Sequence, residues 1–180
     1  MIPARTSQGR TLHVRAVSRR STRGHVTAGG MSWPCALGRS GCRVIKREGD
    51  GATPCGTWRL DLVLYRPDRG PPPATRLPVR ALRPSDGWCD DAADRHYNRW
   101  VQLPYTASAE TLWREDAVYD LIVVLSHNRR PRRRGGGSAI FMHLARPNYA
   151  PTQGCLALSE RDLRLILSQA RVGTRIVISA

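Results

Sequence analysis

Alternation of apolar and polar residues along the chain predicts several short β-strands. Leu12 to Val17 alternates apolar and basic side chains, and Thr57 to Tyr65 alternates with the same period of two. Successive side chains of a strand point to opposite faces, so this period is typical of a half-buried strand. Tyr119 to Ser126 and Ser138 to Ala145 are strongly apolar, and we predict two further strands there.

One segment near the C-terminus has the pattern of an α-helix. Ser159 is a good N-cap, and Asp162 follows three residues later, close to a capping-box position. The apolar residues that follow fall on one helical face: Leu163, Ile166, Leu167 and Ala170. We predict that this helix ends near Gly173 and that a closing strand covers Thr174 to Ser179.

The other segments have weaker patterns. Val26 to Lys46 holds short β-like pieces separated by Gly29-Gly30, Pro34 and Gly41, and Glu110 to Asp116 predicts one or two helical turns. Loops are predicted by composition at Glu48–Gly51, Pro67–Pro78, Arg83–Arg99 and Arg129–Gly137. A long irregular segment such as residues 83–99 is more often a functional loop than a linker.

Many short strands with one convincing helix predict a mainly β fold, a β-sandwich with a helix packed on it. A length of 180 residues suits one domain. We assign residues 1–23 to a basic N-terminal tail with the first strand, in which residues 1–10 form a loose tail. Residues 24–180 form the main domain.

The formal charge of +15 is unevenly distributed. Ten basic residues precede Glu48, the first acidic one, and the rest of the chain carries 19 basic and 14 acidic residues, or +5. Such charge favours contact with a polyanion, although an arginine-rich proteome accounts for it equally simply. The run from Arg129 to Arg134 fits a solvated hairpin tip better than a nucleic-acid site, and no nucleic-acid partner is expected.

Membrane and export signals are missing from the pattern. No apolar run approaches the roughly 20 residues of a membrane span, and we predict no transmembrane segment. The basic N-terminus is not followed by an apolar stretch, so we see no signal peptide.

The chain has five cysteines, and none forms a C-x-x-C pair, which argues against a structural zinc site. An odd number leaves at least one free thiol. Four of them are interpreted as small core residues: Cys35, Cys42, Cys55 and Cys89.

Cys155 has the surroundings of a nucleophile. His143 lies in an apolar strand, and Pro147 and Pro151 keep the connection to Cys155 non-helical, so the loop can fold back. A thiol needs a base to ionise near neutral pH, and an imidazole supplies one. Gly154 permits a tight turn in which backbone N–H groups are exposed to an oxyanion.

This arrangement resembles the catalytic domain of YkuD-type L,D-transpeptidases, in which a strand ending in His is followed by a loop and Ser/Thr-x-Gly-Cys. Three more elements match in order, over roughly residues 24–180. They are Lys46–Pro54 with Gly56-Thr57, then Gly87–Asp91 with Tyr97-Asn98, then Tyr119–Asn128 with Gly137–Phe141. The resemblance implies a YkuD-like β-sandwich with long active-site loops.

By this resemblance, Cys155 attacks a peptidoglycan stem peptide, a thioester forms, and an amine of a second stem resolves it to a 3-3 cross-link. His143 acts as the base, and Thr152 and Gly154 shape the turn and the oxyanion site. The resemblance implies no metal and no cofactor. Substrate contacts are assigned to Trp88, Asp90, Asp91, Tyr97, Asn98 and Gln153. For Asp90-Asp91 a capping or solvated role is favoured, and recognition of a substrate ammonium is the functional alternative. For Tyr97-Asn98 the alternatives are a hydrogen bond to a peptide backbone and anchoring of the loop.

Two departures from the family pattern leave other functions open. Gln153 replaces the second His of Ser-His-Gly-Cys, and Ala157 stands where better-known members carry Arg or Asn. The alternatives are an L,D-carboxypeptidase, an enzyme of D-amino-acid exchange, and a non-catalytic basic domain that binds polyanions. The substrate implies the periplasm or cell envelope, and the charge implies electrostatic contact with anionic wall polymers.

Overall fold

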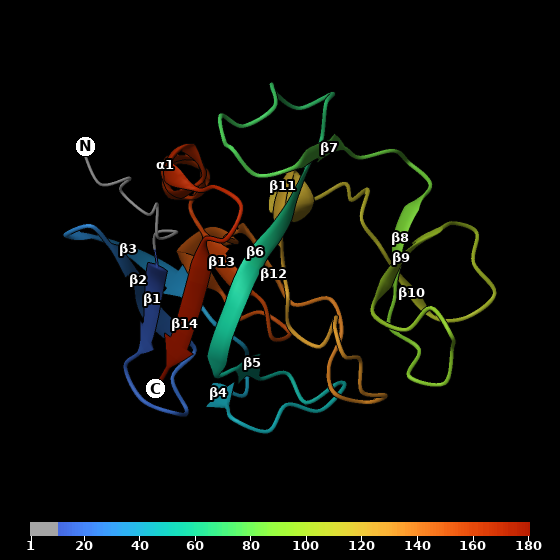
Figure 1. Cartoon of the computed structure of the whole chain (residues 1–180), viewed down its shortest axis with the longest axis horizontal. Coiled ribbons are helices and arrows are strands. Elements are labelled where there is room, and N and C mark those ends of the chain that lie inside the picture. The colour runs from blue at the N-terminus through green and yellow to red at the C-terminus, as the bar shows by residue number, and fades with distance from the viewer. Residues whose placement is uncertain (1–10) are drawn as a thin grey trace, which may run out of the picture.

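The computed structural model describes residues 11–180, so the predicted loose tail, residues 1–10, lies outside the described residues. A large curved sheet forms its centre (Figure 1). Its strands are β1 (Thr11–Ala16), β2 (Arg23–Ala28), β3 (Met31–Ala36), β6 (Gly56–Tyr65), β7 (Val79–Ala81), β11 (Leu121–Leu125), β12 (Phe141–Leu144), β13 (Leu156–Leu158) and β14 (Arg175–Ser179). They follow the order β11-β12-β13-β3-β2-β1-β14-β6-β7, and β11 also pairs with β6. The sheet therefore curves back onto itself and encloses a core.

The strands predicted from alternation and apolar runs are confirmed as β1, β6, β11, β12 and β14. Pro34 does not interrupt the chain as predicted, because it lies inside β3 and pairs with His25. Strand β3 meets β13 only at Ala36, so Pro34 lies where the other edge of β3 has no ladder partner. A proline is tolerated at such an edge because no N–H is needed there.

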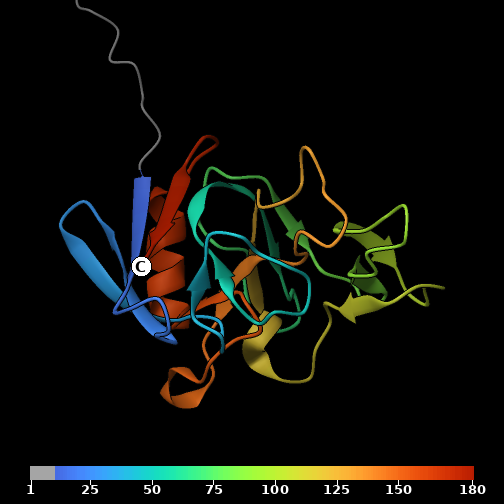
Figure 2. The same ribbon diagram turned by 90° about the horizontal axis from the view of Figure 1, so that it is seen from below.

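The one α-helix within residues 11–180, α1 (Glu160–Gln169), begins as predicted: the Ser159 hydroxyl accepts from the Asp162 N–H at 3.1 Å. Its buried residues pack into the core enclosed by the sheet, next to the N-terminal strands (Figure 2). The helix ends at Gln169, earlier than predicted, because Ala170 is extended and its carbonyl accepts from the Arg76 N–H. None of the helices in residues 11–180 has the length and apolar character needed to cross a membrane.

A small second sheet covers part of the outer face, on the side opposite β1–β3 (Figure 1). It contains β8 (Asp86–Cys89), β9 (Arg99–Gln102) and β10 (Ala109–Thr111), with β8 in the middle. The prediction of helical turns at residues 110–116 was wrong, because Glu110 pairs with Trp88 across β10 and β8. The 3-10 helix η1 (Ala117–Tyr119) follows this segment, and η2 (Pro147–Tyr149) lies after β12.

The two faces of strand β11 contribute to two separate hydrophobic cores. Leu121, Val123 and Leu125 belong to the core with α1, whereas Ile122 and Val124 belong to a second core with Trp88 and Phe141. Since both faces of β11 are covered, its sequence is continuously apolar. The second core, between the main sheet and the small one, is where the candidate site forms.

The predicted domain division after residue 23 stays a prediction. Strand β1, the strand assigned to the N-terminal part, lies within the main sheet between β2 and β14. A further short pair, β4 (Cys42–Arg43) with β5 (Thr53–Pro54), brings together the ends of the loop that carries Lys46 and Glu48.

Candidate active site

Neighbouring parallel strands place Cys155 and His143 on one face of the sheet. His143 lies in β12 opposite Ala157 of β13, and Cys155 directly precedes β13. Side chains two positions apart on a strand share a face. Cys155 and His143 are therefore diagonal neighbours on the face that points to the second core, and the small Ala157 leaves room beside the imidazole.

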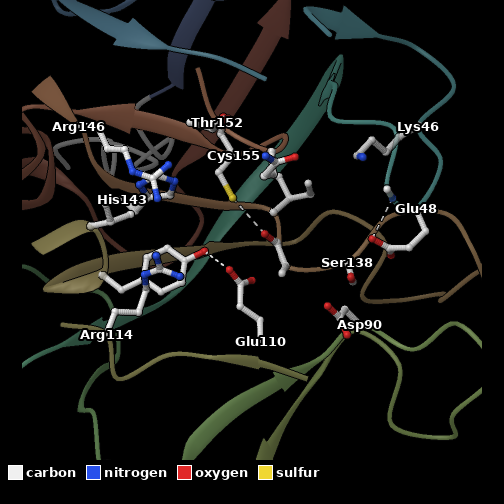
Figure 3. A pocket seen from close by; sticks show the side chains of 16 residues that line it. Lys46, Glu48, Asp90, Glu110, Arg114, Ser138, His143, Arg146, Thr152 and Cys155 are labelled. Carbon is white, nitrogen blue, oxygen red and sulfur yellow. Dashed lines mark hydrogen bonds between the residues drawn. The ribbon is translucent and has the colours of Figure 1, made fainter. Parts of the chain in front are cut away.

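Both side chains open into a cavity of about 370 Å³ (Figure 3). The sequence hypothesis of a shared site is thus consistent with the geometry. Other residues that line the cavity come from the loops and the small sheet, and they include Lys46, Glu48, Asp90, Glu110, Arg114, Tyr119, Ser138, Arg146, Thr152 and Gln153.

The turn before Cys155 is held by the Thr152 hydroxyl. It donates to the Cys155 carbonyl at 2.7 Å and accepts from the Gly154 N–H at 3.1 Å. Gly154 has φ of 133°, and a Cβ there would lie 2.9 Å from the Ala52 carbonyl oxygen, so only glycine fits. Because its N–H already donates to Thr152, Gly154 shapes the turn but does not offer that N–H to an oxyanion here.

Replacing Thr152 with valine should destabilise the protein by about 1–3 kcal/mol, because the buried Gly154 N–H loses its acceptor and the Cys155 carbonyl keeps only the longer contact from the Thr53 hydroxyl, at 3.4 Å. Thr152→Ser keeps the hydroxyl and serves as the matched control. Urea unfolding of both variants measures the difference. Equal stabilities of the valine and serine variants would show that the hydroxyl does not hold the turn.

Cys155 and His143 are both neutral in this structure. The sequence suggested an exposed turn, but the Cys155 side chain is buried, and burial together with the charge of Glu110 raises the thiol pKa to about 12. The thiol donates to the Ala139 carbonyl at 3.1 Å and accepts from the Phe141 N–H at 3.3 Å. A resting thiolate is therefore disfavoured, and the proton must leave as the thiol attacks.

A hydrogen bond to the backbone fixes His143 in the tautomer in which Nε2 can accept a proton. Its Nδ1 lies 3.0 Å from the Leu144 carbonyl, which can only accept, so Nδ1 carries the hydrogen and Nε2 is left as an acceptor. Burial, together with the nearby charges of Arg146 and Arg114, lowers the pKa of His143 to about 4. A neutral imidazole with an unprotonated Nε2 can accept a proton across the neutral pH range.

A second group of residues around the site was not assigned from the sequence. The Tyr119 ring packs edge-on to His143 at 5.3 Å between centroids, and its hydroxyl donates to Glu110 at 2.6 Å. Arg114 and Arg146 both contact Asp116, at 2.7 and 3.4 Å, and the Arg114 guanidinium holds the Asp116 pKa at about 2. Lys46 and Glu48 also line the cavity. The only sequence signal for them is that they lie in the segment Lys46–Pro54, which matches the family pattern.

The comparison with protein families decides the assignment of the chain. The YkuD family model, described as the L,D-transpeptidase catalytic domain, matches residues 13–178. The chain belongs to this family.

Two solved structures are similar to this L,D-transpeptidase-family chain. One is an L,D-transpeptidase from Mycobacterium smegmatis, 14% identical with a TM-score of 0.44 over 96% of this chain and 60% of that chain. The other is Mycobacterium tuberculosis L,D-transpeptidase 1, 13% identical with a TM-score of 0.40 over 95% of this chain and 63% of that chain. The chain thus spans 60% and 63% of their lengths. The search of curated proteins gives no match.

The residues assigned to substrate contact fall into two groups within this L,D-transpeptidase-family fold. Asp90 and Gln153 line the cavity. Trp88 and Asn98 are instead buried in its wall, where the Trp88 N–H donates to the Asn98 side-chain oxygen at 2.9 Å. Asp91 accepts from the Ala93 N–H, which is a local turn contact.

Tyr97 anchors the loops around the cavity. Its side chain is buried, and its hydroxyl donates to Glu48. The Glu48 N–H in turn donates to the Gly135 carbonyl at 2.8 Å, so three loops meet here. These contacts support the anchoring role that the sequence left open for Tyr97.

Asn98 joins three segments by four hydrogen bonds, and we expect Asn98→Ala to lower stability by about 3 kcal/mol. Its amide donates to the carbonyls of His127 and Asn128, and its oxygen accepts from Trp88 and Ala139. Thermal unfolding measures the effect. Asn148→Ala is the matched control, because Asn148 is exposed and has the same left-handed backbone as Asn98, with φ of 57° against 54°. It reports the cost of alanine in that conformation, and the larger loss in Asn98→Ala reports the side-chain hydrogen bonds. A melting temperature that is unchanged in Asn98→Ala would contradict this role.

The arginine loop is only partly the solvated tip that was predicted. Strands β11 and β12 are antiparallel, so residues 129–137 do connect a hairpin. Arg129 nevertheless pairs with Asp61 at 2.8 Å, and Arg132 donates to the Tyr97 carbonyl at 2.6 Å. The loop therefore contributes contacts on both sides, and its remaining arginines, Arg130, Arg133 and Arg134, are exposed.

Proposed function

We propose that the protein is a cysteine-dependent L,D-transpeptidase that acts on peptidoglycan stem peptides through a thioester on Cys155. The observation that supports this most directly is the shared placement of Cys155 and a neutral, basic His143 at one cavity. Thr152 and Gly154 act as the residues of the nucleophile turn. The family assignment supplies the class of reaction.

In the proposed acylation, the thiol turns from Ala139 toward Nε2 of His143 and passes its proton there. Sγ bonds to the carbonyl carbon of the third stem residue, and a tetrahedral intermediate forms. The carbon–nitrogen bond to D-alanine then breaks, and His143 returns the proton to the departing amino group. A thioester on Cys155 remains.

In the second half-reaction, an amine from another stem attacks the thioester carbon and loses a proton as the carbon–sulfur bond breaks. Cys155 regains its hydrogen, and the two stems are joined by a 3-3 cross-link. Water as the acceptor gives carboxypeptidase activity, and a free D-amino acid gives exchange. Contact of the exposed basic surface with anionic wall polymers would bring the enzyme to its substrate. Such a substrate places the activity in the periplasm or cell envelope.

Incubation with a defined tetrapeptide stem, followed by intact-protein mass spectrometry, tests the proposal. The expected adduct has the mass of the donor less D-alanine. Product analysis with a second stem then separates cross-linking from hydrolysis and exchange. An unmodified protein, together with salt-dependent binding to polyanions that does not need Cys155, would favour the non-catalytic alternative.

A further inference from the structure

Three carboxylates line one side of the cavity: Glu48, Asp90 and Glu110. They come from three separate segments, the loop between β4 and β5, the end of β8, and β10. In the view of Figure 3, Glu110 lies below Cys155, Asp90 at its lower right and Glu48 at its right, whereas Arg114 and Arg146 lie to its left with His143. Lys46, which pairs with Asp50, lies above Glu48. The cavity is therefore divided into an acidic wall, formed by these three carboxylates, and a basic side.

The carboxylates of the acidic wall have no ion-pair partner among the described residues, although the charge of Arg114 acts on Glu110, whose pKa is raised by burial. Glu48 and Glu110 accept hydrogen bonds from the neutral hydroxyls of Tyr97 and Tyr119. One side-chain oxygen of Asp90, Oδ1, is fully buried and has no hydrogen-bond partner within residues 11–180. None of the three carboxylates takes part in an ion pair among these residues.

The cations that line the cavity are, by contrast, already paired. Lys46 contacts Asp50, and Arg114 and Arg146 share Asp116. The acidic wall therefore gathers three carboxylates without an ion-pair partner in a chain whose formal net charge is +15. Partly buried carboxylates without a cation are costly, and a cationic ligand removes that cost.

We propose that the acidic wall binds the ammonium group of the acyl donor, the free side-chain amine of the diamino acid whose carbonyl Cys155 attacks. The inference rests on the proposed function and adds which residues select the donor. Glu110 is the centre of this site, because it lies between Asp90 and the Tyr119 ring that packs on His143. Glu48 lies at the exposed rim.

We assign the ammonium to the donor rather than to the acceptor, because Cys155 loses its proton during acylation, before the acceptor binds. The charge of Glu110 opposes formation of a thiolate at Cys155. An ammonium bound at the acidic wall offsets that charge, and it is needed before acylation, since the thiolate is consumed in that step. The amine that arrives later, on the acceptor, comes too late to assist.

Binding to the unreactive Cys155→Ala protein tests the acidic wall without requiring turnover. Two tetrapeptides are compared by calorimetry, one with L-lysine at the third position and one with Nε-acetyl-lysine. We expect the free amine to bind at least about tenfold more tightly, as for a charge-assisted contact. Adding Glu110→Gln or Asp90→Asn should reduce this ratio to within about twofold.

The matched control is Glu115→Gln, which removes one negative charge from a side chain that is 94% exposed and outside the cavity. It should keep the full preference for the amine. Equal affinities for the two peptides in Cys155→Ala, or a preference that survives Glu110→Gln with Asp90→Asn, would overturn the inference. A clear preference in a protein whose wild type forms no acyl-enzyme would overturn the proposed function alone.

A second measurement uses the reactivity of the Cys155 thiol, for which removing the carboxylate should raise the rate rather than weaken binding. In the protein with Cys155 intact, Glu110→Gln should speed alkylation of Cys155 by iodoacetamide, because removing the carboxylate lowers the thiol pKa. Peptide mapping assigns the reaction to Cys155. General damage to the site would slow alkylation or leave it unchanged, so that result would contradict the electrostatic link between Glu110 and Cys155.

Discussion

Cys155→Ala is expected to lower the rate of acyl-enzyme formation by at least ~10³-fold while the protein stays folded, since loss of a nucleophile removes the covalent route. The side chain is small and neutral, and its hydrogen-bond partners are backbone groups, the Ala139 carbonyl and the Phe141 N–H. Intact-protein mass spectrometry with a tetrapeptide donor measures the rate, and circular dichroism confirms the fold.

Cys55→Ala is the matched control for this prediction. Cys55 is the most exposed of the five thiols, and it directly follows β5, outside the cavity. A donor that binds in the cavity should not acylate Cys55, whereas a non-specific thiol reagent should react with Cys55 first. Persistence of the adduct in Cys155→Ala and its loss in Cys55→Ala would refute the proposed mechanism.

The sequence predicts those parts of the fold in which the order of apolar and polar residues along the chain follows the burial of their side chains. The alternation in residues 12–17 and 57–65 gives β1 and β6, and the Ser159 cap begins α1 where expected. The small sheet was missed because its strands are three or four residues long and pair across intervening loops. Such short strands have no periodicity to detect, and their hydrogen bonds depend on tertiary structure.

The candidate site likewise has a part that local sequence features predict and a part that depends on the tertiary fold. The pair of Cys155 and His143 could be proposed because the turn and the apolar strand are local features, and the family pattern links them. For the acidic wall the sequence offered only Asp90, as one alternative for binding an ammonium, since Glu48, Asp90 and Glu110 meet only after three segments fold together.

A matching motif also does not say where a side chain points. Trp88 and Asn98 belong to a matching segment and were assigned to substrate contact, yet both are buried in the wall of the cavity. The motif in this case identifies residues that build the site, whereas the residues that face a ligand are found only from the folded arrangement.

Removing the base at His143 should make acylation steeply dependent on pH. With the His143 pKa lowered to about 4, the imidazole is neutral from pH 6 to 9 and can accept the thiol proton throughout, so the wild-type rate should vary little. In His143→Gln the thiol, with a pKa near 12, must ionise unaided. Its thiolate fraction rises about tenfold per pH unit, so the deficit of the variant should shrink by about 10³-fold between pH 6 and pH 9.

His127→Gln is the control for this pH profile, because His127 is also a buried histidine whose pKa is lowered by burial. It packs on Trp58 and its Nε2 contacts the Gly136 carbonyl, away from Cys155, so its loss should leave the wild-type pH profile unchanged. Stopped acylation reactions, sampled by mass spectrometry at each pH, give both profiles. A His143→Gln deficit of constant size from pH 6 to 9 would mean that His143 supports the structure of the site and does not take the proton from Cys155.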